Sequence, residues 1–370
     1  MSTTGIVGRN SGTRSLGIGI VGLSAAGGWA AAGHVPALQA VDGVELRGLA
    51  ASSAASGHAA GMAYGVPAYT SVEQLAAADD IDMVVIAVKV PAHRELVLSA
   101  LNAEVPVLCE WPFAKNLPEA EEMAGAAVGI RTFVGLQGRT LPTVRWVADL
   151  VAGGYVGEVL STTIVMASDE WGNPISERER YTLDRKLGAT MLAIAFGHAI
   201  DLVSSVVGEL REVVATTATR HPRVALGRTG QTVSMTAFDQ IAVSGTLPGG
   251  AVLSVHHRGG VASGAAFTWA IDGTEGTLEI SAPGHPHLSP LTVRGAKRGA
   301  RPAEMALPDG YDDYASLGGP IHSLAHAYDA IRDDLSRGDA VVPDFDHAVR
   351  RHRLLDAIVR AATTGRRVSL

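Results

Sequence analysis

The chain has 370 residues, of which 47% are hydrophobic and 18% charged, and its formal net charge is −7. This length is too great for one ordinary core and predicts two globular domains. The acidic balance argues against nucleic-acid binding, which requires a basic surplus. The single cysteine, Cys109, excludes an intrachain disulfide and a cysteine-based metal site, as expected for a reducing compartment.

The first fifteen residues contain scattered Gly, Ser, Thr and Arg and no apolar segment typical of a signal peptide. We therefore predict a disordered tail over residues 1–15. No apolar run is long enough to span a bilayer, so we expect no membrane insertion and a cytoplasmic location.

Short apolar runs alternate with helical patterns over the first 150 residues. Strands are predicted at 16–21, 44–49, around 69, 81–88, 105–109 and 132–136, and helices at 29–38, 53–63, 92–102, 117–127 and 142–151. This alternation predicts a parallel sheet covered by helices on both faces, which is a doubly wound Rossmann domain over residues 16–140.

After about Gly157 the predicted strands follow one another directly. They lie at 159–167, 210–218, 232–238, 240–247, 251–257 and 267–272, with helices at 188–207, 322–335 and 345–364. This order predicts an α+β domain over residues 141–370, with a largely antiparallel open sheet covered by helices.

A glycine-rich turn follows the first predicted strand. Residues 17–22 fit G-x-G-x-x-G, but they belong to the strand itself, whereas the phosphate-binding turn comes after a strand. The working turn is 22–27, and its predicted cofactor-binding residues are Gly22, Ser24, Ala25, Ala26 and Gly27. Gly22 permits the tight turn, Gly27 lets the next helix pack closely, and Ser24 replaces the usual second glycine.

The second predicted strand ends at Ala-Ala-Ser-Ser, residues 50–53. Ser52 and Ser53 are predicted to lie beside the cofactor. Neither the acid that favours NAD nor an arginine that favours NADP is present there, so the choice between NAD and NADP stays open.

Several motifs in chain order resemble the Gfo/Idh/MocA family of oxidoreductases. They are Gly-Leu-Ser-Ala-Ala-Gly-Gly-Trp at 22–29, Tyr-Thr-Ser-Val-Glu-Gln-Leu at 69–75, residues 81–87, Cys-Glu-Trp-Pro at 109–112, Leu-Gln-Gly-Arg at 136–139, Phe-Gly-His-Ala-Ile-Asp at 196–201, and residues 361–366. The resemblance implies an NAD(P)-dependent protein that binds a sugar. Within the family, the chain is similar to the fungal galactose-pathway repressor-like branch, with which it shares the segments 22–29, 136–139 and 196–201 and the Trp of Glu-Trp-Pro.

Two departures from the family pattern affect the expected chemistry. Family dehydrogenases carry Glu-Lys-Pro, and that lysine is the usual acid/base, whereas here Trp111 cannot exchange a proton. Ile194 stands in place of the usual Asp. The resemblance implies that His198 is the general base. Lys89, at the carboxyl end of the strand 81–88, is a candidate replacement for the lysine, with a solvated loop charge as the alternative.

The resemblance also assigns roles to the remaining candidate site residues. Glu110 is expected to hold the nicotinamide ribose. Val88 is expected to lie at the cofactor, and Trp111 against the nicotinamide or the substrate. His93 is expected to cap the following helix and to line the cofactor cleft. The candidate substrate-binding residues are Arg139, Trp171, Arg178, Arg180, Tyr181, Arg185, Lys186 and Asp201.

The basic cluster among these residues predicts an anionic substrate, because arginine binds carboxylate or sulfonate groups in bidentate fashion. The alternative is a solvated face in which Glu177, Glu179 and Asp184 pair with the basic residues. Trp171 and Tyr181 form an apolar face for a sugar ring or pack under the loop. No metal is expected, because adjacent His256 and His257 on a strand face opposite ways.

Three functions follow from this pattern. The favoured one is an NAD(P)-dependent enzyme acting on a sugar or glycoside, including a redox-neutral NAD-dependent glycosidase for an anionic glycoside such as a sulfoquinovoside. The alternatives are an ordinary sugar dehydrogenase and a non-catalytic sensor of cofactor or sugar. We also expect a homo-oligomer formed through the C-terminal sheet.

Overall fold

The first sheet has the parallel topology predicted for a Rossmann domain. The structure is a computed structural model that describes residues 14–227, 230–338 and 340–370, so nearly all of the predicted tail lies outside the described residues. The strands are β1 (Leu16–Val21), β2 (Val44–Ala50), β3 (Ala68–Tyr69), β4 (Met83–Ile86), β5 (Val107–Glu110) and β6 (Thr132–Gly135). Their order is β3-β2-β1-β4-β5-β6, and every pair is parallel.

Helices pack against this sheet, and several begin at the capping residues that the sequence supplies. They are α1 (Val35–Ala40), α2 (Ala54–Tyr64), α3 (Val72–Ala76), α4 (His93–Leu101) and α5 (Leu117–Gly125). Ser53, Ser71 and Asn116 each accept a backbone N–H of the following helix, which satisfies a donor at the helix start. A π turn, Ala30–His34, precedes α1.

The second sheet is long, open and mostly antiparallel, as predicted. Its order is β16-β15-β14-β13-β7-β12-β11-β8-β17, and β7 and β12 form a parallel pair within it. The strands are β7 (Val159–Ala167), β8 (Glu212–Ala218), β11 (Gln240–Thr246), β12 (Val252–Arg258), β13 (Ala266–Gly273), β14 (Gly276–Ala282), β15 (Thr292–Lys297), β16 (Ala303–Met305) and β17 (Val368–Ser369). The short strands β9 (Arg223–Ala225) and β10 (Thr232–Ser234) pair separately.

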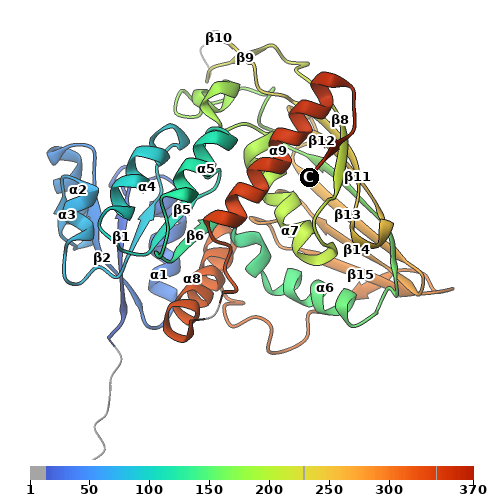
Figure 1. Cartoon of the computed structure of the whole chain (residues 1–370), viewed down its shortest axis with the longest axis horizontal. Coiled ribbons are helices and arrows are strands. Elements are labelled where there is room, and N and C mark those ends of the chain that lie inside the picture. Colours follow the sequence, from blue (N-terminus) through green and yellow to red (C-terminus); the bar gives the residue numbers. More distant parts are fainter. Residues whose placement is uncertain (1–13, 228–229, 339) are drawn as a thin grey trace, which may run out of the picture.

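One face of the second sheet is covered by α6 (Pro142–Ala152), α7 (Gly197–Val207) and α9 (Phe345–Thr364), which lie between it and the first domain (Figure 1). Along β7, β12 and β13 buried residues alternate with more exposed ones, as in a sheet covered on one side. Apolar side chains on the sheet strands that remain exposed include Leu160, Val165, Val214 and Val252. Self-association through this sheet stays a prediction.

The last part of the chain returns to the first domain. Helix α8 (Gly319–Arg337) packs on α1, and its Leu324 and Tyr328 share a core with Ile18 and Ile20 of β1. Helix α9 packs on both α5 and β8, so it joins the two domains. None of the described helices is long and apolar enough to cross a membrane.

Two regions differ from the sequence prediction. The helix expected over 188–207 begins as a π turn, Leu192–Phe196, and continues as α7. Strands β9 and β14 to β17 are not among the predicted strands. Of these, β14 alternates buried and half-buried residues, whereas β16 and β17 have two or three residues, too few for a periodic pattern.

Candidate active site

The glycine-rich turn directly follows β1, as the sequence predicts. The alternative G-x-G-x-x-G match at residues 17–22 lies within that strand except for its last glycine. Gly22 has φ +98°, and a Cβ there would lie 2.6 Å from the carbonyl oxygen of Ala87, so only glycine fits. Ser24 Oγ accepts the backbone N–H of Ala26 (3.1 Å). Gly27 does not provide the predicted close packing for the next helix, because a Cβ on it would meet no atom within 4 Å and the turn is open on that side. Its φ of +90° is what favours glycine there.

A pocket of about 560 Å³ lies between this turn and the ends of β2 and β4. It is lined by Gly22, Ser24, Ser52 and Val88, among others, and its charged residues are Glu73 and Glu95. Ser53 instead caps α2 through its hydroxyl. A strand, a tight glycine turn and an adjoining pocket of this size fit the adenosine and pyrophosphate groups of a dinucleotide.

A second cavity, of about 250 Å³, lies where β4, β5 and β6 end. It brings together six of the predicted residues, which are Val88, His93, Glu110, Trp111, Tyr181 and His198. Ligands bind at this carboxyl edge of parallel sheets, because the loops that follow the strands converge there.

Besides Glu110 Oε1, four buried polar atoms of residues that line this cavity lack a hydrogen-bond partner among the described residues. They are Trp29 Nε1, Gln137 Oε1, His198 Nδ1 and His287 Nδ1. Buried polar groups are nearly always paired, so these residues are candidates for contacts with a polar ligand. A polyhydroxylated molecule offers the donors and acceptors that these atoms require.

His198 lies at the start of α7 and is buried. Its ring stacks on His287 with centroids 3.9 Å apart and planes 12° apart. Burial lowers the pKa of His198 to about 4, although the charges of Glu110 and Asp201 oppose this shift. Burial likewise lowers the pKa of His287. Both rings are therefore neutral at pH 7.

Trp111 is held in place by a hydrogen bond to the helix that carries His198. Its Nε1 donates to the carbonyl of Ala193 (2.7 Å), inside the π turn, and the indole also packs on His352. A Cβ on Gly197 would lie 2.6 Å from Trp111 Nε1, so the glycine makes room for the indole. Trp111 therefore forms a wall of the cavity, and its only polar atom is already engaged.

Glu110, the last residue of β5, is supported by residues that the sequence analysis missed. His34 Nε2 lies 3.1 Å from Glu110 Oε1, and His34 Nδ1 is 2.6 Å from the hydroxyl of Tyr328 on α8. A Cβ on Gly135 would come within 2.6 Å of the same carboxylate oxygen. No local sequence pattern connects these positions, which are far apart along the chain.

His93 does not cap α4 through its side chain, because it is the first residue of the helix and Ala92 is the N-cap. Its Nε2 lies 3.0 Å from the carbonyl oxygen of Val88, and its Nδ1 lies 3.1 Å from that of Phe113. The ring thus connects the end of β4 to the segment after β5. Burial lowers the pKa of His93, despite the opposing effect of these carbonyl groups.

A separate cleft of about 860 Å³ contains most of the basic cluster. Its lining includes Lys89, Arg180, Arg185, Lys186 and Arg223, with Glu177 and Asp184 as acidic members. Tyr181 lines both this cleft and the smaller cavity. Lys89 is not among the described residues that line the smaller cavity, and its Nζ lies 4.8 Å from the centre of the Tyr181 ring.

Arg178 lies apart from the cleft and against the cofactor turn. A Cβ on Gly28 would clash with the Arg178 guanidinium, so this side chain lies directly over the glycine that follows the turn. Trp171, in contrast, is buried, and its Nε1 donates to the carbonyl of Thr182 (3.2 Å). Its position matches the alternative in which it packs under the loop.

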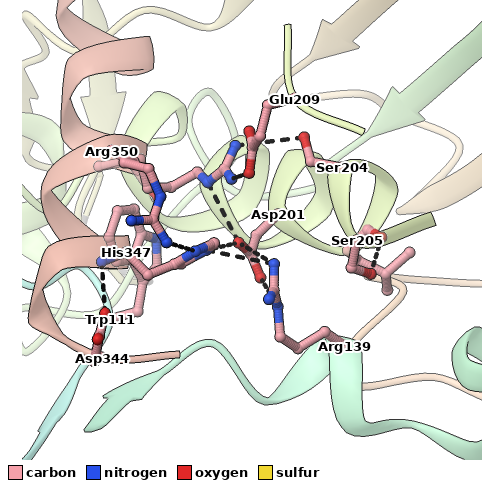
Figure 2. Close-up of polar contacts among 12 residues, drawn as sticks. Trp111, Arg139, Asp201, Ser204, Ser205, Glu209, Asp344, His347 and Arg350 are labelled. Carbon is pink, nitrogen blue, oxygen red and sulfur yellow. Dashed lines mark hydrogen bonds and ion pairs between the residues drawn. The ribbon is translucent and has the colours of Figure 1, made fainter. Parts of the chain in front are cut away.

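Arg139 and Asp201 lie together in a buried ion cluster and are not among the described residues that line the cavity (Figure 2). Arg139 Nε is 3.0 Å from Asp201, His347 Nε2 is 2.5 Å away, and Arg351 Nε is 3.3 Å away. Although burial opposes ionisation, Arg139, His347 and Arg351 hold the pKa of Asp201 well below its usual range. The geometry indicates a structural role for Asp201, because its charged partners come from α9 and from the segment after β6. No local sequence pattern reveals the partners on α9.

Comparison with known proteins supports both domains. Residues 16–133 match the family model described as "Oxidoreductase family, NAD-binding Rossmann fold", and residues 142–282 match "Gal80p, C-terminal domain". The chain is 29% identical over 333 residues to "Dehydrogenase aclE" of Aspergillus oryzae, covering 87% of this chain and 88% of the relative. It is also 29% identical over 360 residues to the galactose/lactose metabolism regulatory protein GAL80 of Saccharomyces cerevisiae, covering 85% of this chain and 82% of that protein.

Solved structures share the fold across nearly the whole chain. A crystal structure of a super-repressor mutant of Gal80p from Saccharomyces cerevisiae has a TM-score of 0.86 at 22% identity, covering 96% of this chain and 98% of that one. Levoglucosan dehydrogenase in complex with NADH and L-sorbose has a TM-score of 0.83 at 22% identity, with the same coverage of both chains. A regulator and a dehydrogenase thus share this architecture.

Proposed function

Because the chain belongs to the Gfo/Idh/MocA oxidoreductase family, near its Gal80-like branch, we propose that it is an NAD-dependent enzyme that oxidises a hydroxyl group of a sugar. The observation that carries this proposal is the neutral imidazole of His198. It lies among other unpaired polar atoms in a cavity at the carboxyl edge of the sheet.

The chain's own residues divide the work as follows. NAD bound in this pocket would supply the hydride acceptor for oxidation of the hydroxyl group. The imidazole of His198 would take the proton of that hydroxyl, since its ring is neutral at pH 7. Trp29, Gln137 and His287 orient the other hydroxyl groups, and Glu110, held by His34, lies at the cofactor side.

The cofactor pocket favours NAD over NADP. Among the described residues that line it, the charged side chains are Glu73 and Glu95, and none is basic. A 2′-phosphate placed there would be repelled by these carboxylates and would find no arginine or lysine partner.

The basic cleft supports an anionic substrate as the finer form of this proposal. Tyr181 is shared by the cleft and the cavity, so a sugar ring in the cavity can extend a carboxylate or sulfonate toward Arg180, Arg185 and Lys186. The acidic residues Glu177 and Asp184 offset part of this charge. The cleft is therefore expected to select an anionic substrate through bidentate contacts from its arginine guanidinium groups.

A substrate panel tests the proposed activity. The protein is incubated in deuterated water with NAD and with matched neutral and anionic sugars and their aryl glycosides. We expect NADH to accumulate with anionic sugars and more slowly with neutral ones. Aglycone release without net NADH formation, with deuterium at C2 of the sugar, would show that the protein is a redox-neutral glycosidase and not a dehydrogenase.

A non-catalytic regulator is the second candidate, and Trp111 favours it. This residue occupies the position of the family lysine, cannot transfer a proton, and is fixed to Ala193. The match of residues 142–282 to the Gal80p C-terminal domain points the same way. Tight NAD binding without turnover of any compound in the panel would establish the regulator instead of the enzyme.

We further propose that Arg178 binds the cofactor pyrophosphate, in place of the substrate contact that the sequence suggests. Its guanidinium lies over Gly28, next to the open side of the turn. Replacing Arg178 with Ala is expected to weaken NAD binding roughly 10- to 150-fold, the equivalent of losing a hydrogen bond to a charged group. The measurement is calorimetric titration with NAD.

Arg180→Ala provides the matched control for this prediction. Arg180 is two residues away, equally exposed, and paired with Glu177 (3.2 Å) in the basic cleft. We expect Arg180→Ala to leave NAD affinity unchanged. If Arg178→Ala also leaves NAD affinity unchanged but raises KM for an anionic sugar, Arg178 is a substrate residue.

A further inference from the structure

Three side chains with metal-binding atoms converge at the start of α8, away from the proposed active site. His322 and His326 are four residues apart on the helix, so their imidazoles lie on the same side. Asp312 comes from the loop before the helix. Its Oδ1 lies 2.9 Å from His322 Nε2 and 2.9 Å from His326 Nε2.

We propose that Asp312, His322 and His326 bind one divalent transition-metal ion, with Zn²⁺ as the best match. One ligand atom from each residue lies within 4.8 Å of the others. Tetrahedral Zn²⁺, with ligand distances of about 2.0–2.2 Å, requires ligand atoms about 3.3–3.5 Å apart. The two distances of 2.9 Å between Asp312 and the histidines must therefore widen slightly to admit the ion.

The chemistry of the three ligands selects the class of ion. Two imidazole nitrogens and one carboxylate oxygen suit Zn²⁺ and Co²⁺, whereas Ca²⁺ and Mg²⁺ prefer oxygen ligands alone. The side chains of Asp312 and His322 are 18% and 21% exposed and that of His326 only 5%, so an ion can enter from solvent. That exposure leaves the fourth coordination position to water.

A charged side chain on a neighbouring helix opposes cation binding. The positive charge of Arg145 on α6 acts against a cation here, so we expect weaker binding than in a fully structural zinc site.

The ion would fasten the loop before α8 to the helix, and this role is independent of the proposed enzymatic function. None of the three residues is among the described residues that line the cavity. Helix α8 also carries Tyr328, which supports His34 and through it Glu110. A metal at this position therefore stabilises a helix that positions the active site without entering the chemistry.

Metal titration of the untagged, metal-free full-length protein tests this proposal. Zn²⁺ is titrated by calorimetry, and Co²⁺ by its visible absorption in a site containing imidazole ligands. We expect one ion per chain and a higher Tm when Zn²⁺ is present. Asp312→Asn, His322→Gln and His326→Gln should each weaken Zn²⁺ binding by more than about 10-fold, since even removing a partner of a ligand has this effect.

His58→Gln is the control, because His58 is exposed on α2 and should not contribute. If His326→Gln fails to fold, Asp312→Asn and His322→Gln decide the question. The Tm of each of these two variants without metal shows separately whether it is folded. Equal Zn²⁺ affinity in the wild type, Asp312→Asn and His322→Gln would overturn the proposal. The three residues would then form a hydrogen-bonded cluster only.

Discussion

Replacing His198 with Ala is expected to lower kcat/KM by about 10²–10⁴-fold, the usual effect of losing a general base. His198 Nδ1 has no partner among the described residues and lines the cavity beside Trp111 and Glu110. NAD affinity should change little, because His198 is not among the described residues that line the pocket at the glycine-rich turn. Steady-state kinetics on the best substrate of the panel, together with an NAD titration, give both values.

The pH profile provides a second readout of the same role. Burial lowers the pKa of His198 to about 4. A base must be deprotonated to act, so wild-type kcat/KM should fall only as the pH drops through about 4, well below the range of an ordinary histidine. An acid limb near the ordinary histidine value would mean that another group is the base.

Trp111→Phe is the matched control in the same cavity. The change removes the hydrogen bond from Nε1 to Ala193 but keeps an aromatic wall. We expect kcat/KM to stay within about tenfold of wild type, because Trp111 transfers no proton and one neutral hydrogen bond contributes about 1 kcal/mol. Equal, mild losses in both variants would point to the regulator, in which neither residue takes part in chemistry.

The features predicted correctly from the sequence depend on local geometry. The turn at Gly22 was identified because a strand, a glycine that must adopt positive φ, and a helix follow one another within a few residues. Glu110 and Val88, which the resemblance assigned to the cofactor, line one cavity because the carboxyl ends of parallel strands meet at one edge. Only the turn follows from the strand assignments alone.

The features that were missed depend on contacts between distant segments. His287 comes from a loop between β14 and β15, where no periodicity indicates which way a side chain points. His34 and Tyr328 are nearly three hundred residues apart, yet together they hold Glu110. Lys89 lies at the predicted carboxyl edge of the sheet, but its side chain lines the basic cleft and not the smaller cavity. Strand order alone does not determine such orientations.

Asp201 shows how a local prediction can point to the wrong neighbours. It lies one helical turn after His198, so a role in substrate binding followed naturally from the resemblance. Position i+3 on α7 instead faces α9, where His347 and Arg351 approach from more than 140 residues later. The resulting charge cluster joins α7, α9 and the segment after β6 (Figure 2).

Replacing Asp201 with Ala should therefore destabilise the protein by about 3–5 kcal/mol, the usual effect of leaving buried charges without their partner. Arg351 is fully buried, and Arg139 is mostly buried, so both would keep a positive charge with less compensation. The denaturant midpoint of unfolding, measured by circular dichroism at pH 7, reports the change. At this pH the full effect is present, because the lowered pKa of Asp201 gives stability that is lost only below the usual carboxyl range.

Two further variants separate this structural role from substrate binding. Asp201→Asn keeps the shape and removes the charge, so most of the destabilisation should remain. Glu121→Ala removes the partner of Arg353 in an exposed pair (3.0 Å) and should cost at most about 1 kcal/mol. If Asp201→Asn has wild-type stability but a raised KM, Asp201 contacts the substrate and the cluster is not what holds α7 to α9.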